Sequence, residues 1–230
     1  MKASFFGTPV GDQMVDSQRY PDTIKNYLSE EQELLSVISR NFDTIVEVGC
    51  MQGRLLKWVA EQRKRYIGID VEDGYLEAWK ALSSESESSL IEFVLGDAQD
   101  LKGSLSKLNH PVSPSSTILV FPFNSFGNIM DVRKAVSSLA SIGMKFILFS
   151  YDTTAYANEV RAEYYRSCGL RAIHKTESDE AVIFSSTEGM KSHAYQSHFL
   201  KQCFRQSGVD VTAIPFGKIG VGWSNVAVMP

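Results

Sequence analysis

Short apolar runs alternate with amphipathic stretches through the first two thirds of the chain. Each run has the length of a buried strand, and the stretches between runs place apolar residues three and four positions apart, as helices that pack by one face do. Strands that alternate with helices in this way predict an α/β fold with a doubly wound, mostly parallel sheet. The runs are Ile45–Val48, the residues that lead to Asp70, Ile91–Leu95, Thr117–Phe121 and Lys145–Ser150.

The last third of the chain has a different pattern. It contains two predicted helices, three short segments typical of strands, and two apolar runs that would form a closing hairpin. We interpret residues 170–196 as an antiparallel excursion from the main sheet. The helices are Ala155–Cys168, with a tyrosine-rich face (Tyr156, Tyr164 and Tyr165), and Ser197–Ser207. The strand segments are Leu170–Lys175, Ala181–Ser185, Met190–Tyr195, Val209–Phe216 and Gly222–Met229.

The first forty residues contain an irregular start and two predicted helices, at about Pro21–Tyr27 and Ser29–Arg40. Ser29, with Gln32 three positions later, has the sequence of a capping box at the start of the second helix. A further segment, residues 83–89, is acidic and rich in serine. We expect this segment to be a solvated loop.

Composition narrows the class of protein. With 230 residues and 43% hydrophobic content, the chain fits one domain, residues 1–230, with a substantial core. Its net charge of -4 and its scattered Lys and Arg residues argue against a nucleic-acid surface, and no run approaches the roughly 18 to 20 apolar residues of a membrane span. Three cysteines without C-x-x-C spacing predict neither a disulfide framework nor a metal site. We expect a cytoplasmic protein with a small or protein substrate and leave its oligomeric state open.

The first strand leads into a loop with two glycines. Gly49 and Gly53 lie where the strand turns into a helix, so backbone N–H groups and the positive end of the helix can face a ligand. Asp70 ends the next strand, 21 positions after Gly49. That is the spacing of a carboxylate that binds ribose hydroxyls in nucleotide-binding α/β proteins. This unit therefore predicts a cofactor that contains a nucleoside.

The loop sequence, Glu47-Val48-Gly49-Cys50-Met51-Gln52-Gly53, resembles [DE]-x-G-x-G-x-G, the first motif of the class I S-adenosylmethionine (SAM)-dependent methyltransferases. It lacks the G-x-G-x-x-G spacing of dinucleotide-binding folds. An acid near the loop suits SAM, which carries a cationic sulfonium and an amino group. Met51 replaces the middle glycine. It could displace the loop from the methionyl group, or it could point outward and leave the backbone path intact.

Two later segments resemble motifs of the same family. Asp97 and Ala98 follow the third strand and look like the adenine-binding motif, in which the carboxylate accepts from the exocyclic amine. Residues Phe123–Asn128 resemble the F-N-S-[FL]-[GA]-x-[IL] segment of many small-molecule methyltransferases, which faces the transferred group. Asn124 could hold a substrate amine there through its amide.

The resemblance implies a seven-stranded sheet, lid helices in residues 1–40 and a roof over the active site in residues 170–196. It also implies SAM as cofactor and a small-molecule substrate, methylated by in-line transfer. The implied cofactor-binding residues are Glu47, Gly49, Cys50, Met51, Gly53, Asp70, Val71, Asp97, Ala98 and Phe123. The implied catalytic residues are Asn124 and the aromatic lid residues Tyr20 and Tyr27, whose rings could face the sulfonium; no metal is expected.

Two other functions stay open at this point. Small relatives that look like methyltransferases cyclise the methionyl group of SAM to azetidine-2-carboxylate and release methylthioadenosine. Two residues keep this alternative open. Met51 could change the position of the methionyl arm, and Asn124 could hold its neutral amine. The second alternative is a Rossmann-type oxidoreductase, or a nucleotide-binding regulator without activity. Glu47 before the loop and the missing third glycine argue against its nicotinamide form.

Overall fold

The computed structural model describes residues 5–84 and 90–227. Three parts of the sequence-based predictions lie outside this range: the first four residues of the lid region, residues 85–89 of the acidic loop, and residues 228–230 at the end of the closing hairpin. In the described part, helix α4 (Leu76–Ser84) extends into the start of the predicted acidic loop.

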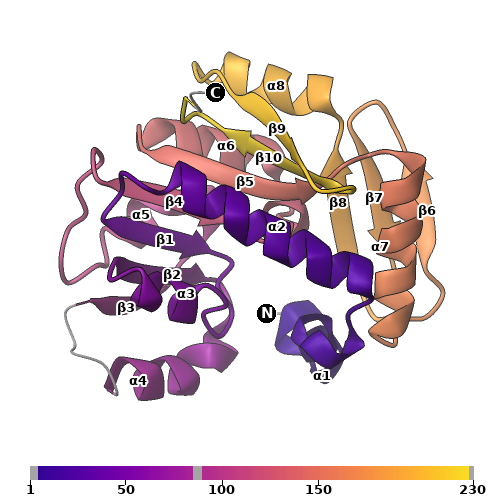
Figure 1. Ribbon diagram of the computed structural model, residues 1–230, viewed down its shortest axis with the longest axis horizontal. Helices are drawn as coiled ribbons and strands as arrows, with labels where there is room; N and C mark the ends of the chain where they lie inside the picture. The colour runs from indigo at the N-terminus through magenta and orange to yellow at the C-terminus, as the bar shows by residue number, and fades with distance from the viewer. Residues whose placement is uncertain (1–4, 85–89, 228–230) are drawn as a thin grey trace.

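Seven strands form the main sheet, in the order β3-β2-β1-β4-β5-β10-β9 (Figure 1). The first five are parallel, and β10 is antiparallel to both of its neighbours. This architecture confirms the predicted α/β fold, including the closing hairpin. The strands are β1 (Thr44–Val48), β2 (Arg65–Asp70), β3 (Ile91–Leu95), β4 (Thr117–Phe121), β5 (Lys145–Tyr151), β9 (Thr212–Phe216) and β10 (Gly220–Ser224).

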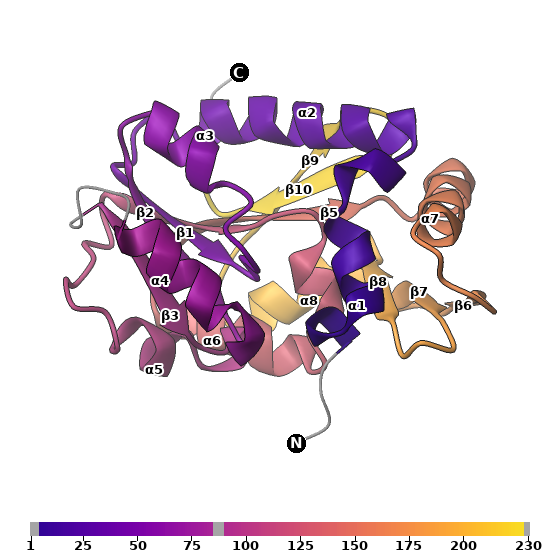
Figure 2. The same cartoon turned by 90° about the horizontal axis from the view of Figure 1, so that it is seen from below.

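Helices cover both faces of this sheet, as Figure 2 shows. Helices α2, α3 and α7 pack on one face and α5, α6 and α8 on the other. Ile45 belongs to the first of these cores and its neighbour Val46 to the second, because successive side chains of a strand point to opposite faces. The helices are α2 (Asp22–Ile38), α3 (Leu56–Glu61), α5 (Leu101–Leu105), α6 (Val132–Ser141), α7 (Ala155–Ser167) and α8 (Ser197–Gln206).

A separate antiparallel sheet of three strands follows α7, in the order β6-β7-β8. It consists of β6 (His174–Glu177), β7 (Ala181–Ser185) and β8 (Lys191–Tyr195), which is the predicted excursion. The first strand begins later than predicted. Gly169 and Ala172 have φ values of +82° and +46°, and such left-handed residues interrupt an extended chain.

The N-terminal region differs from its prediction in one respect. Instead of two helices, α2 runs without a break over 17 residues, so Ser29 lies inside a helix and does not cap one. Ile24, Tyr27, Leu35 and Ile38 are buried along its whole length, and this continuous stripe packs the helix onto the sheet. Only the segment before α2 lies over the ends of the strands. It comprises a helical turn, α1 (Pro9–Asp12), and three 3-10 turns between Phe5 and Arg19.

Candidate active site

The site lies at the carboxyl ends of β1 and β4. The chain passes from β1 to β2 on one side of β1, whereas β4 lies on its other side, and such a switch point is where open α/β sheets bind ligands. The loops after the two strands touch: Ser125 Oγ donates to Val48 O at 2.9 Å. A Cβ on Gly49 would lie 2.8 Å from Ser125 Cβ. Glycine is therefore required for the two loops to approach this closely.

The glycine loop keeps its conformation despite the methionine in the middle. Gly49, Met51 and Gly53 have φ values of +78°, +48° and +87°, so Met51 adopts the left-handed conformation that favours glycine. Trp79 Nε1 donates to the Met51 carbonyl at 2.6 Å, which helps to hold this conformation. The Met51 side chain is partly buried and packs against the cluster of Cys50, Tyr75 and Trp79.

Asp70 joins the loop to the end of β2. Its Oδ2 accepts from Met51 N at 2.7 Å and its Oδ1 from Glu72 N at 3.1 Å. Burial raises the pKa of Asp70, and the backbone N–H donors act in the opposite direction. The carboxyl group therefore lies against the backbone of the loop, and its role at the ribose stays a prediction. Val71, beside it, is exposed.

Asp97 and Ala98 follow β3 at the next strand end of the sheet. Asp97 is partly exposed, and its carboxylate accepts from both Gln99 N and Gln99 Nε2. Ala98 is buried. Cys50 is also buried, and its Sγ lies 2.8 Å from where a Cβ on Gly68 would be. The thiol therefore points back onto β2, and only the backbone of Cys50 belongs to the loop surface.

Glu47 lies beneath the loop. Its Oε2 accepts from Leu55 N at 3.0 Å and from Tyr66 Oη at 2.6 Å, so this oxygen fixes the start of α3, and the contact of Glu47 with the methionyl end stays a prediction. Its Oε1 is buried and has no hydrogen-bond partner in the described part of the chain. Burial raises the pKa of Glu47 to about 7, although the charge of Arg54 lowers it.

A second buried carboxylate was not predicted. Glu31 of α2 forms an ion pair with Arg54 of the glycine loop and accepts from Phe123 N at 2.7 Å. Its side chain is 1% exposed, and burial raises its pKa while Arg54 lowers it. One feature of the sequence indicated that Glu31 is buried. Glu31 lies four residues after Tyr27 and four before Leu35, within the apolar stripe of the helix.

The turn after β4 presents an aromatic ring to the lid. Phe123 and Asn124 have φ values of +45° and +60°, a strained conformation for residues with side chains. The ring of Phe123 lies 5.7 Å from that of Tyr20 and 5.8 Å from that of Tyr27, between centroids, and Arg54 lies 5.8 Å from its centre. The structure thus brings together the rings of Tyr20, Tyr27 and Phe123, whose roles toward the cofactor stay predictions.

Asn124 differs from its prediction. It is 2% exposed; its Nδ2 donates to Ser192 Oγ at 3.0 Å, and its Oδ1 accepts from Ser150 Oγ at 2.8 Å. The left-handed backbone at the strand end turns this side chain inward, between β5 and β8. These contacts give the amide a structural role in joining the roof to the sheet. In this arrangement both polar atoms of the Asn124 amide already have partners within the protein.

The segment before α2 covers the site. Phe6 O accepts from Tyr75 Oη at 2.9 Å, next to the end of β2. Further along, Met14 O accepts from both Tyr20 Oη and Tyr164 Oη. In Figures 1 and 2 this segment lies across the ends of the parallel strands, between α4 and α7. It therefore occupies the position predicted for a lid.

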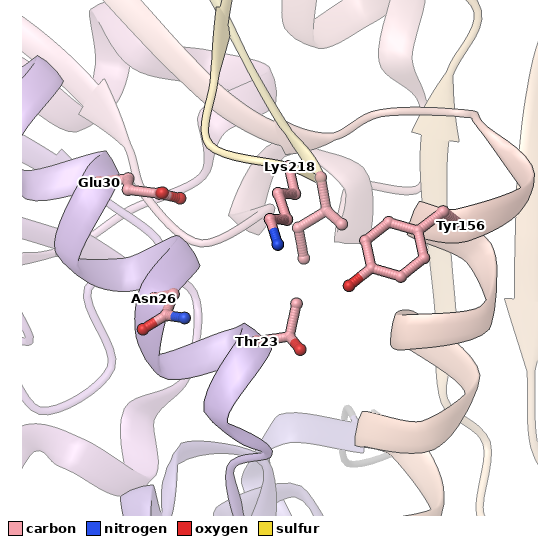
Figure 3. A pocket seen from close by; sticks show the side chains of 6 residues that line it. Thr23, Asn26, Glu30, Tyr156 and Lys218 are labelled. Atoms are coloured by element: carbon pink, nitrogen blue, oxygen red, sulfur yellow. The ribbon is translucent and has the colours of Figure 1, made fainter.

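A cleft between α2, α7 and the β9–β10 hairpin lies apart from this site (Figure 3). Its volume is about 80 Å³, whereas pockets for drug-sized ligands have about 300 Å³ or more. The cleft is therefore too small for a nucleoside cofactor. Thr23, Asn26, Glu30, Tyr156 and Lys218 surround it.

Comparison with known proteins agrees with the geometry of the loop. A family model described as "Methyltransferase domain" matches residues 45–136, the part of the chain that contains the glycine loop, Asp70, Asp97 and the turn after β4. Residues 45–136 are thus similar to a methyltransferase domain, and the sheet has the class I methyltransferase fold. No curated protein matches this sequence.

Solved structures share the fold of this chain at low sequence identity. The 1,6-didemethyltoxoflavin-N1-methyltransferase of Burkholderia thailandensis, solved with 1,6-didemethyltoxoflavin and S-adenosylhomocysteine, is 9% identical, with a TM-score of 0.59 over 97% of this chain and 88% of that chain. The glycopeptide N-methyltransferase MtfA, complexed with SAM, is 14% identical, with a TM-score of 0.57 over 89% and 95%. A SAM-dependent methyltransferase from Aquifex aeolicus is 12% identical, with a TM-score of 0.57 over 94% and 97%. At these identities the likeness shows the fold.

The described residues contain neither a metal site nor a membrane-spanning helix. Within residues 5–84 and 90–227, no three His, Cys, Asp or Glu side chains are grouped so that they could hold a metal ion. No helix in these same residues has the length and hydrophobicity needed to cross a membrane.

Proposed function

We propose that this protein transfers the methyl group of SAM to a small-molecule acceptor, with the glycine loop and Asp70 as the centre of its cofactor site. The observation that carries the proposal is the conformation of the loop. Gly49, Met51 and Gly53 all keep positive φ values, and Asp70 accepts a hydrogen bond from Met51 N. Backbone and one carboxylate thus form a single surface at the switch point of the sheet, which suits a nucleoside ligand.

The donor and acceptor groups of the site fit SAM. Each oxygen of Asp70 accepts one backbone N–H, and a carboxylate oxygen can accept two hydrogen bonds, so both oxygens can also accept from ribose hydroxyls. Asp97 and the backbone of Ala98 would bind adenine. The unpaired Oε1 of Glu47 is a buried acceptor under the loop, and an added donor there would satisfy it.

Bound SAM supplies a methyl group that its sulfonium already activates. The protein therefore needs to align the acceptor and to exclude water, and a strong base is not essential. Phe123, Tyr20 and Tyr27 provide aromatic surface beside the loop, and aromatic faces attract cations. The covering segment that ends at Tyr20 would keep water from the reacting atoms.

The enclosed aromatic region beyond Phe123 supports a small acceptor. Tyr27, Tyr151 and Tyr164 pack around its ring and are all buried. Proteins of the same fold include one solved with 1,6-didemethyltoxoflavin, so the architecture accommodates a compact acceptor. We place the acceptor on this side of Phe123.

Calorimetric titration with SAM and with S-adenosylhomocysteine tests the proposal. Asp70→Ala should weaken binding of both by about 10- to 100-fold, because hydrogen bonds to a charged group contribute about 1.5–3 kcal/mol. Asp73→Ala, which removes an exposed carboxylate three residues later, should leave binding unchanged. Wild-type protein that binds neither compound, or Asp70→Ala protein that binds like the wild type, would refute the cofactor site. SAM incubated with the protein alone should stay intact.

A further inference from the structure

Arg161 is a buried cation without an anionic partner. It lies on the inner side of α7 with 0% exposure. Its Nη atoms donate to Asn158 Oδ1 and Val182 O at 3.4 Å and to Ser192 O at 3.1 Å, while its Nε has no acceptor. In the part of the chain that the structure describes, no carboxylate lies within 4 Å of it. Burial of a charge is strongly unfavourable unless an opposite charge compensates it.

Aromatic rings surround this guanidinium. Its carbon lies 4.7 Å from the ring centre of Phe184, 5.1 Å from that of Tyr151 and 6.0 Å from that of Tyr165. These cation–π contacts offset part of the cost of burial, but they leave the Nε–H donor unpaired. We call Tyr27, Phe123, Tyr151, Tyr165 and Phe184 the aromatic shell.

The aromatic shell contains a second unpaired polar group. The hydroxyl of Tyr27 is buried and has no hydrogen-bond partner in the described residues. The ring of Tyr151 lies near both residues, since its centre is 5.2 Å from that of the Tyr27 ring and 5.1 Å from the guanidinium of Arg161. A phenol O–H and a guanidinium N–H can both donate to an anion, so an anionic group bound among these rings would offer an acceptor to either donor.

The shell adjoins the cofactor site. Phe123 is one of its members, and Arg54 of the glycine loop lies 5.8 Å from the centre of that ring. On the outside, Met14 O accepts from the hydroxyls of Tyr20 and Tyr164. Together with the hydrogen bond from Tyr75 to Phe6 O, these two hydrogen bonds join the covering segment to the domain, and bonds between neutral groups are readily exchanged for bonds to water. A ligand would enter the shell from the side of this segment.

We propose that the acceptor substrate carries a carboxylate, and that Arg161 binds this carboxylate within the aromatic shell with the Tyr27 hydroxyl as a second donor. The proposal rests on the proposed function and adds the chemical class of the acceptor. The carboxylate provides the missing counter-charge, and the rings accommodate a planar or apolar body. Arg161 then orients the acceptor relative to Phe123 and the methyl group.

The test uses full-length protein saturated with S-adenosylhomocysteine. Benzoate, phenylacetate and indole-3-acetate are titrated calorimetrically, each beside its neutral amide. We expect at least one carboxylate to bind the wild type at least tenfold more tightly than its amide. Arg161→Met should abolish this preference. Arg161→Lys should keep the preference at reduced affinity, because a point charge lacks the guanidinium fork. The control Arg166→Met, at an exposed position of the same helix, should leave the preference unchanged.

The outcomes separate this proposal from the proposed function. Binding of S-adenosylhomocysteine without any preference for carboxylates over amides would overturn the role of Arg161 and leave the cofactor site standing. A preference that survives in Arg161→Met would do the same, since an arginine with a purely structural role affects stability and not ligand charge. Tyr27→Phe is the second variant: it retains the buried ring, and an unchanged carboxylate affinity would remove Tyr27 from the site. Wild-type protein without affinity for S-adenosylhomocysteine would refute both.

Discussion

Replacement of Glu47 by glutamine should remove a pH dependence from the stability of the fold. The carboxyl group has an ordinary pKa of 4.5, and burial raises it to about 7 in the folded protein. Between these two values the folded state keeps a proton that the unfolded state releases. Glu47 therefore contributes its full stabilisation below about pH 4.5, and this contribution is lost as the pH rises through 7.

The size of the effect follows from the pKa shift. One unit corresponds to 1.36 kcal/mol, so the shift of Glu47 from 4.5 to about 7 corresponds to roughly 3 kcal/mol in the free energy of unfolding. Glutamine carries no titrating proton. Its carbonyl can accept from Leu55 N and Tyr66 Oη in place of Oε2, and its amide N–H₂ would take the unpaired Oε1 position, at a pH-independent cost of about 1–3 kcal/mol.

Urea unfolding of wild type and Glu47→Gln at pH 5, 6, 7 and 8 measures the difference directly. The free energy of unfolding of the variant, minus that of the wild type, should rise by roughly 3 kcal/mol from pH 5 to pH 8. The pH-independent cost of the substitution does not affect this rise. Glu163→Gln removes an exposed carboxylate from α7 and serves as the matched control. A difference for Glu47→Gln that stays flat with pH, or falls, would refute the reasoning.

Two further substitutions test the surroundings of the loop. Glu31→Ala should lower the free energy of unfolding by about 3–5 kcal/mol, because the substitution leaves Arg54 without its buried partner. Urea unfolding measures this loss, and Glu33→Ala, at an exposed position of the same helix, is the control. Met51→Val should lower the thermal midpoint and weaken SAM binding, since a β-branched residue disfavours φ near +48°. Met51→Gly should retain SAM binding, and weaker binding by the glycine variant than by the valine variant would contradict this view of the loop.

Local patterns were sufficient to predict the sheet and to place the candidate cofactor residues at one edge of it. A parallel sheet places the ends of successive strands along one edge, so Gly49, Asp70 and Asp97 could be expected to lie close together from their positions in sequence alone. The resemblance of the loop to the methyltransferase motif agrees with the methyltransferase domain that matches residues 45–136. The individual residue assignments stay predictions.

Side-chain contacts between residues that are far apart in sequence could not be predicted from the sequence. Asn124 was expected to face the acceptor, but Ser150 and Ser192, which lie 26 and 68 positions away, bind its amide. Glu31 and Arg161 interrupt apolar stripes of their helices, and an isolated charge in such a stripe indicates burial without identifying its partner. For Glu31 the partner is Arg54, 23 positions along the chain. Only the folded structure shows that Arg161 has none within the described residues.

Buried Glu31 would also link the proposed cofactor side of the site to the proposed acceptor side. Glu31 binds the glycine loop through Arg54 and the turn after β4 through Phe123 N, so α2 fixes both sides at once. The backbone of Phe123 has a φ of +45°, which is unfavourable for a residue with a side chain, and the hydrogen bond that Phe123 N donates to the buried Glu31 carboxylate offsets that strain. The ring of Phe123 also belongs to the aromatic shell, 6.3 Å from the ring of Tyr151. A ligand that displaces Arg54 from Glu31 would therefore loosen the hold on Phe123 and, through it, the entrance to the acceptor region.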